Sequence, residues 1–371
     1  MKMADLNSTP KAGRVHIGFF GLRNAGKSTL LNAFSSQDIA IVSDVAGTTT
    51  DPVSKAMEIS QLGACMLIDT AGLDDIGVLG LKRVKKTLSV LSTCDIAVWV
   101  EDGFSDASGY EERFMKECSR LNVKVFRYRR GDDVEKLKKD IAECKIEDEI
   151  PGLLDGLVKK GDRVLFVCPI DQSAPKGRLI LPQVQAIREC LDIGAIAEVR
   201  QPFSLQGDLG VFDLVVTDSQ AFAEVAPKIP PQVRLTGFSV LFARQKGDLA
   251  AYVRGLERIG ELKDNDKVLI AEGCTHRRHC QDIGTVKIPR ALEKLSGKKL
   301  QFVFSSGGDF NVESDVSLIV QCGGCMLSRR EVLRRIALSN SVDVPIVNYG
   351  MVLAAAAGIS VESLLPSDAK E

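Results

Sequence analysis

Short apolar runs alternate with amphipathic stretches along almost the entire chain. In the N-terminal part, apolar runs bounded by polar residues predict buried strands at 15–20, 65–69 and 96–100. Apolar residues at helical spacing predict helices at 27–36, 78–91 and 110–121. Strands and helices that alternate in this way are typical of a parallel α/β fold.

The same alternation continues beyond a polar segment at 145–155, which contains proline and glycine and predicts a linker. The strands predicted beyond it lie at 163–167, 195–199, 214–217, 267–271, 300–304 and 316–320. The helices predicted there follow Pro182 or cover 221–226, 248–262 and 328–338. We therefore expect three α/β domains with mainly parallel sheets, at 1–148, 155–255 and 256–371, with the long helix at 248–262 leading into the third.

Composition and charge exclude several kinds of partner. Hydrophobic residues make up 45% of the chain and charged residues 26%, which is usual for a folded protein. Lys plus Arg number 48 and Asp plus Glu 49, so the chain lacks the basic excess that is usual in proteins that bind nucleic acid through its phosphates. No apolar run approaches the roughly 18 residues of a membrane span, and the N-terminus lacks the apolar core of a secretory signal. We expect a cytoplasmic protein with no nucleic-acid or membrane partner.

Residues 21–28, GLRNAGKS, match the phosphate-binding pattern GxxxxGK[ST] between a predicted strand and a predicted helix. In this context, backbone N–H groups face the phosphates of a nucleotide. Lys27 is expected to reach the β- and γ-phosphates, and the Ser28 hydroxyl to bind Mg²⁺. The predicted nucleotide site consists of Gly21, Asn24, Ala25, Gly26, Lys27, Ser28 and Thr29.

Two further motifs follow in the order that a GTPase requires. Residues 47–51, GTTTD, offer the hydroxyls of Thr48 and Thr49 to nucleotide and Mg²⁺. Residues 69–72, DTAG, place Asp69 to hold Mg²⁺ through water and Gly72 to meet the γ-phosphate. We expect hydrolysis of GTP to GDP and phosphate to depend on Lys27, Thr49, Asp69 and Gly72.

The residue after DTAG is Leu73, so the glutamine that usually orients the attacking water is missing. This part of the chain resembles the TrmE–Era branch of GTPases. The resemblance implies that Asn24 binds K⁺, which replaces an arginine finger in that branch.

The base-recognition end departs from a complete GTPase, which carries NKxD after its fifth strand and an SA-type loop after its sixth. Here a predicted strand at 123–128 leads into RRGD at 129–132 and a predicted helix at 134–144. Either RRGD is a degenerate NKxD that keeps only Asp132, or a strand–helix unit is missing and RRGD stands near the last loop. Both interpretations predict weakened guanine selectivity.

Ten cysteines are many for a protein in a reducing compartment, so clustered cysteines suggest a metal site. Cys274 and His276 follow one predicted strand, and the sequence CGGC, Cys322 to Cys325, follows another. Parallel strands bring both loops to the same sheet edge. The spacing alone is about equally consistent with an iron–sulfur cluster and with a structural Cys₃His zinc site. Arginines at 277, 278, 329 and 330 favour the iron–sulfur cluster, because it is the more anionic of the two groups.

Further segments carry a resemblance to the HydF family, the maturation GTPases of FeFe-hydrogenase. They are PID at 169–171, APKGRLILPQ at 174–183, TDSQAF at 217–222, LFAR at 241–244, the cysteine segments and VPIVNYG at 344–350. The resemblance extends over nearly all of the chain. One departure is Gln321, which stands where the family has the histidine of HCxxC.

The resemblance implies domains for GTP binding, dimerisation and cluster binding, in that order. It implies a 4Fe-4S cluster on Cys274, Cys322 and Cys325. His276, two residues from Cys274, is a candidate fourth ligand by its position in the sequence. The implied role is a scaffold that receives a transient diiron precursor, made with two radical-SAM maturases, and delivers it to the FeFe-hydrogenase apoprotein. A homodimer is implied as well. The rival hypotheses are a regulatory or RNA-modification GTPase with a structural zinc domain, and an interaction scaffold with a vestigial P-loop.

Overall fold

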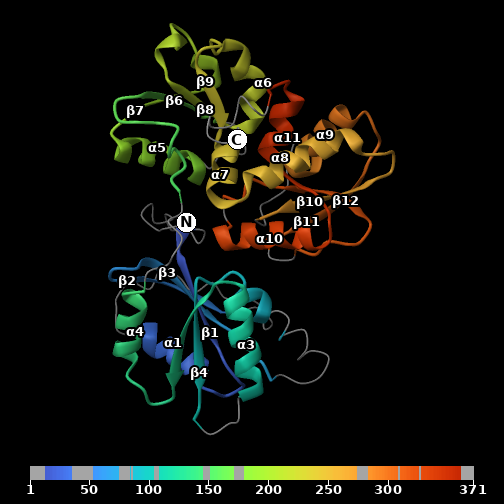
Figure 1. Cartoon of the computed structure of the whole chain (residues 1–371). Coiled ribbons are helices and arrows are strands. Elements are labelled where there is room, and N and C mark those ends of the chain that lie inside the picture. The colour runs from blue at the N-terminus through green and yellow to red at the C-terminus, as the bar shows by residue number, and fades with distance from the viewer. Residues whose placement is uncertain are drawn as a thin grey trace, which may run out of the picture. The chain divides into compact units, whose positions relative to one another are not determined.

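The computed structural model of the chain describes residues 13–35, 53–74, 84, 87–103, 108–144, 151–170, 179–273, 283–307, 310–325 and 327–360. The chain divides into two compact units, Met1–Glu149 and Ile150–Glu371 (Figure 1). The described residues form three mainly parallel sheets, one in the first unit and two in the second, which confirms the predicted α/β class. No helix in these ranges is both long and apolar enough to cross a lipid bilayer.

The first unit is built on a five-stranded sheet with the order β2-β3-β1-β4-β5. Its strands are β1 (Val15–Phe20), β2 (Ser54–Ile59), β3 (Gly63–Asp69), β4 (Ile96–Glu101) and β5 (Lys124–Arg129). Its helices are α1 (Lys27–Ser35), α3 (Ser108–Arg120) and α4 (Val134–Ala142). Only β2, which the hydrophobic pattern did not predict, runs antiparallel to its neighbour. The parallel strands end at a common edge, where β1 leads into the GxxxxGKS segment and β3 ends at Asp69.

The helices cover the two faces of this sheet (Figure 1). Phe114 and Cys118 of α3 pack with Trp99 on one face, whereas Leu137 and Ile141 of α4 pack with the apolar side of α1 on the other. A right-handed crossover from β5 to a further outer strand would place its helix on the α3 face. Because α4 lies on the α1 face instead, the chain turns back after β5 without such a crossover.

The second unit contains two four-stranded parallel sheets, in the orders β7-β6-β8-β9 and β11-β10-β12-β13. The strands of the first are β6 (Arg163–Val167), β7 (Ile196–Arg200), β8 (Leu214–Thr217) and β9 (Arg234–Gly237). Those of the second are β10 (Lys267–Glu272), β11 (Gln301–Ser306), β12 (Val316–Gln321) and β13 (Ile346–Asn348). The helices are α5 (Leu181–Ile193), α6 (Phe222–Val225), α7 (Phe238–Lys246), α8 (Leu249–Glu257), α9 (Ile288–Ser296), α10 (Arg329–Ser341) and α11 (Tyr349–Ala356).

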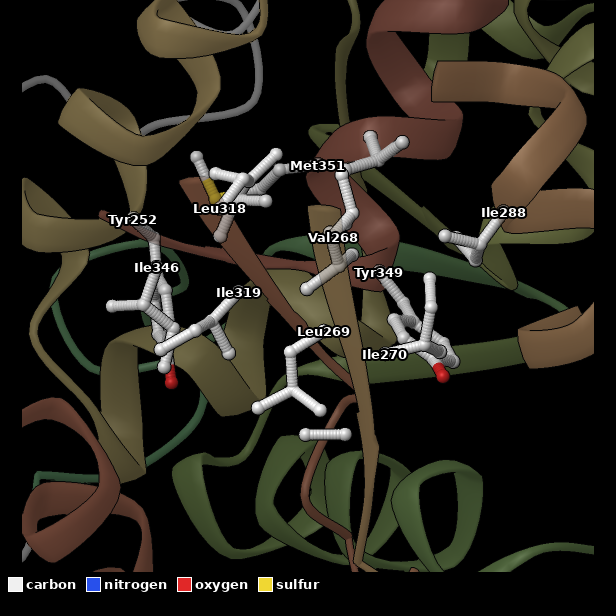
Figure 2. Close-up of a cluster of buried hydrophobic side chains, with 14 of the residues drawn as sticks. Tyr252, Val268, Leu269, Ile270, Ile288, Leu318, Ile319, Ile346, Tyr349 and Met351 are labelled. Carbon is white, nitrogen blue, oxygen red and sulfur yellow. The ribbon is translucent and has the colours of Figure 1, made fainter. Parts of the chain in front are cut away.

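The predicted helix at 248–262 is wrong in its length, because α8 ends at Glu257 and a tighter turn at Arg258–Glu261 follows. Its Tyr252 packs into a core that surrounds β10 and β12, together with Val268, Leu318 and Met351 (Figure 2). The same core includes Val240 and Ala243 of α7. Helices α7 and α8 and strands β10 and β12 therefore share one apolar core.

Candidate functional site

The GxxxxGKS segment forms a loop with three left-handed backbone positions, Gly21, Asn24 and Gly26. A Cβ atom at Gly21 would lie 2.3 Å from the carbonyl oxygen of Val100, so only glycine fits between β1 and β4 there. Asparagine tolerates the left-handed region better than most residues, which suits the φ of 58° at Asn24. Asn24 and Thr29 are exposed and Ala25 is buried.

Lys27 is the first residue of α1 and is only 7% exposed. Its ammonium donates a hydrogen bond to the Leu22 carbonyl oxygen at 2.6 Å, and a longer one to that of Gly21 at 3.4 Å. The ammonium is thus folded into the loop that precedes it. From this position the ammonium can also donate a hydrogen bond to an anion that the loop and the helix N-terminus would bind.

Ser28 and Asp69 come from different motifs and meet across the end of the sheet. The Ser28 hydroxyl donates to Asp69 Oδ2 at 2.5 Å. The other oxygen of Asp69, Oδ1, is buried and has no hydrogen-bond partner among the described residues. A hydroxyl and a carboxylate with a spare oxygen are the hard oxygen ligands that Mg²⁺ prefers, so the residues fit this ion.

The DTAG segment lies directly against the phosphate-binding loop. The Leu73 N–H donates to the Gly21 carbonyl oxygen at 3.2 Å, and Asp74 Oδ1 accepts the Arg23 backbone N–H at 2.7 Å. A Cβ at Gly72 would come within 2.7 Å of the Arg23 nitrogen, so glycine allows this approach. Thr48 and Thr49, the other residues expected at this site, lie outside the described residues.

The RRGD segment closes a tight turn between β5 and α4. Asp132 Oδ2 accepts the backbone N–H of Arg129 at 2.8 Å, and the Asp132 N–H donates to the Arg129 carbonyl at 2.9 Å. One carboxylate oxygen is therefore used within the turn. Together with the position of α4 on the α1 face, this favours the interpretation in which a strand–helix unit is missing.

The second candidate site lies where β10 and β12 end side by side. The Cys322 N–H donates to the Ala271 carbonyl at 2.9 Å, and Cys322 Sγ accepts the Gly273 N–H at 3.0 Å. Cys274 is the next residue after Gly273 but, like His276, lies outside the described residues. Among the described residues no group of three or more potential ligands is assembled. The structure thus joins the backbone before Cys274 to Cys322.

The thiol of Cys322 is in an environment that disfavours an uncompensated negative charge. Burial raises the pKa of Cys322, and the N–H groups of Gly324 and Gly273 and the charge of Arg335 oppose that effect only in part. Cys322 and Cys325 are sulfur ligands of the kind that zinc and iron–sulfur clusters take, and a bound metal would supply the positive charge that a Cys322 thiolate needs. Cys325, three residues further on, is half-buried.

Lys246, which the sequence analysis did not single out, lies under this segment. Its ammonium donates to the carbonyl oxygens of Gly324, Cys325 and Leu327 at 3.2, 3.2 and 2.9 Å. Burial lowers the pKa of Lys246 to about 8, although nearby Cys325 and Cys322 act in the opposite direction. No motif marks this lysine, since it ends a helix far from the cysteines in sequence.

Gln321 and the neighbouring arginines occupy defined places around the loop. Gln321 is 1% exposed, and its amide nitrogen donates to the Tyr252 hydroxyl at 3.2 Å. Its Oε1 atom is buried without a partner within the described ranges. Arg329 donates to the Gln245 carbonyl at 3.2 Å, and the buried Arg335 bonds Glu331 at 2.8 Å.

Three family models match successive parts of the chain. The 50S ribosome-binding GTPase model matches residues 16–148. The hydrogen maturase F dimerization domain matches residues 153–247, and the hydrogen maturase F tetramerization domain matches residues 250–366.

Curated relatives match only part of the chain. GTPase Der of Campylobacter hominis is 40% identical over 102 residues, or 28% of this chain and 22% of that protein. The tRNA modification GTPase MnmE of a Sulfurovum species is 29% identical over 220 residues, or 53% of this chain and 43% of that protein. The chain thus spans less than half the length of these relatives.

Solved structures give a weaker likeness. The G domain of the FeoB iron transporter from T. maritima is 20% identical over 35% of this chain and 98% of its own, with a TM-score of 0.25. Era of Aquifex aeolicus with GDP and AlF₄⁻ is 15% identical over 87% of this chain and 97% of its own, also at 0.25. Scores at this level carry no argument about function.

Proposed function

The chain belongs to the hydrogen maturase F family, and from this premise we propose that it is a GTPase and 4Fe-4S scaffold that receives a diiron precursor and delivers it to apo FeFe-hydrogenase. The observation that carries the proposal is the order of the matches, in which a P-loop GTPase domain precedes both hydrogen maturase F domains. The rival zinc-containing RNA-modification GTPase would leave residues 153–366 without an explanation.

In the proposed GTPase site, the loop from Gly21 to Ser28 holds the phosphates and Lys27 neutralises their charge. The contact between Ser28 and Asp69 supports Mg²⁺ binding, because it brings two suitable oxygen ligands together beside the loop. Thr48, Thr49 and Gly72 complete the proposed site around the γ-phosphate. Asn24, exposed on the left-handed turn of the loop, is the proposed K⁺ ligand.

In the proposed cluster site, Cys274, Cys322 and Cys325 hold three irons of the cluster. The cluster would supply a fourth iron with an exchangeable ligand, to which an incoming diiron unit can attach. The Gly273 N–H on Cys322 Sγ supports this assignment, since it joins the two cysteine-bearing strand ends. Gln321 is a weak ligand whose amide nitrogen bonds Tyr252, so we place it beside the cluster rather than on it.

We further propose the three-part division at 1–148, 155–255 and 256–371, and a homodimer formed through the middle part. Two radical-SAM maturases are the proposed donors of the diiron precursor. Nucleotide hydrolysis would control partner release through the switch segments around Thr49 and Gly72 rather than act on the cluster.

The proposal is tested with full-length protein purified without oxygen after co-expression with the two maturases. Mixed with apo FeFe-hydrogenase, it should restore hydrogen evolution. The Cys322→Ser variant should lose this activity and its iron, whereas Cys190→Ser changes a buried thiol of the middle part and should retain both. Failure of the wild-type protein to activate the apoprotein would contradict the delivery role.

A further inference from the structure

The contacts of Lys246 connect two regions that the family models separate. Lys246 is the last residue of α7, within residues 153–247. The carbonyl groups that it binds belong to Gly324, Cys325 and Leu327, within residues 250–366. One buried side chain thus connects the end of the middle part to the CGGC loop.

The hydrogen-bonding capacity of the Lys246 ammonium is fully used. An ammonium has three N–H donors, and three carbonyl oxygens accept from it at 3.2, 3.2 and 2.9 Å. The charge also lies 4.8 Å from the centre of the Phe242 ring, at a distance suited to a cation–π contact. With 7% exposure, the group is a fixed internal cation rather than a solvated one.

These contacts fix the shape of the loop. Gly324 adopts a left-handed backbone at φ +65°, and its carbonyl oxygen is one of the three that Lys246 binds. Without the ammonium, the buried carbonyls would lose a charge-assisted partner, which is costly away from water. The positive charge also lies under the segment that carries both Cys322 and Cys325, and Lys246 has no carboxylate partner among the described ion pairs.

We propose that Lys246 is a positioning residue for the CGGC segment, which ties the loop to the end of α7 and places a positive charge beside the thiolates of a bound cluster. The inference rests on the proposed iron–sulfur function. A fixed cation beside an anionic cluster stabilises the reduced, more negative state, so it raises the reduction potential.

The test compares four variants of the full-length protein, reconstituted with iron and sulfide without oxygen. Lys246→Met removes charge and donors, Lys246→Gln removes the charge but keeps two N–H donors on a shorter side chain, and Lys246→Arg keeps the charge. Lys138→Met is the matched control, because Lys138 is also 7% exposed and lies 5.6 Å from the Phe34 ring in the first unit. Iron content and midpoint potential, followed by EPR in a redox titration, are the measurements.

Lys246→Met is expected to lose more than about half of its iron, because the loop loses its three donors. The cluster that remains in Lys246→Met and Lys246→Gln should have a more negative midpoint potential, whereas Lys246→Arg and Lys138→Met should match the wild type. If Lys246→Met does not fold, the potentials of the Gln and Arg variants decide. Wild-type potentials in the neutral variants would overturn the role of Lys246, whereas a wild-type protein without iron would overturn the proposed function itself.

Discussion

The hydroxyl of Ser28 donates a hydrogen bond to Asp69 Oδ2 at 2.5 Å, although 41 positions separate the two residues. The contact arises because β1 and β3 are parallel neighbours, so the helix that follows β1 begins beside the residue that ends β3. It leaves the buried Oδ1 of Asp69 as the open position for a cation or its water shell.

Removal of the Asp69 charge should abolish most Mg²⁺-dependent hydrolysis. Asp69→Asn keeps the size of the side chain but weakens its attraction for the metal, so we expect a loss of roughly 100-fold or more in kcat. Phosphate release at saturating GTP measures it. Ser35→Ala is the control, since among the described residues the Ser35 hydroxyl bonds only the Asn32 carbonyl on the same helix. Activity within about threefold of wild type in Asp69→Asn would contradict the assignment.

Hydrolysis should be faster in K⁺ than in Na⁺, and Asn24 should be responsible. Asn24→Gly removes the amide but keeps a residue suited to the left-handed φ of 58°, so it tests the ligand without backbone strain. The variant should show equal rates in the two salts. Asn122→Gly, which changes another left-handed asparagine at φ 49°, should keep the K⁺ preference. Equal rates in the wild type would remove the proposed K⁺ site.

The sequence predicted the P-loop and the long buried strands because each carries its own local pattern. It missed β13, which has three residues, and β9, whose four residues include only one apolar side chain, Leu235, whereas the equally short β8 is a nearly continuous apolar run. It also could not identify Lys246, whose contacts span 78 to 81 positions and depend on how α7 packs beside α10 and α11. The sequence pattern instead indicated the arginines at 329 and 330 as the positive charges near the site, because they lie close to the cysteines in sequence.

Weak base discrimination is predicted by both interpretations of RRGD, a degenerate NKxD and a missing strand–helix unit. Strong discrimination needs buried polar groups that pair fully with the base, and Asp132 uses one carboxylate oxygen within its own turn. We expect the affinity for GTP to exceed that for ATP or inosine triphosphate by much less than about a thousandfold. Competition against a fluorescent GDP analogue measures these affinities. A preference of that order would show that another segment recognises guanine.

The first unit should lose stability in alkali. Burial raises the pKa of Cys65 and Cys118 from 9.0 to about 12, so both thiols stay protonated in the folded unit while unfolded chains release the protons. The contribution of the two protonated thiols to the free energy of unfolding is fully present below pH 9. It is lost as the pH rises from 9 towards 12, by about 1.4 kcal/mol per pH unit for each thiol.

Fluorescence of Trp99, the single tryptophan, follows this unit in urea, because the side chain is fully buried in its core. Cys118→Ala should reduce the slope of stability against pH between pH 9 and 11 by the share of one thiol. A slope equal to that of the wild type would mean that Cys118 does not stay protonated in the folded unit.

Iron, sulfide and zinc analysis of protein purified without oxygen tests most directly whether the second unit holds an iron–sulfur cluster. We expect brown protein with about four iron and four sulfide per chain, loss of both in the Ser variants of Cys274, Cys322 and Cys325, and retention in Gln321→Ala and His276→Ala. Colourless protein with one zinc per chain and no sulfide would contradict the account.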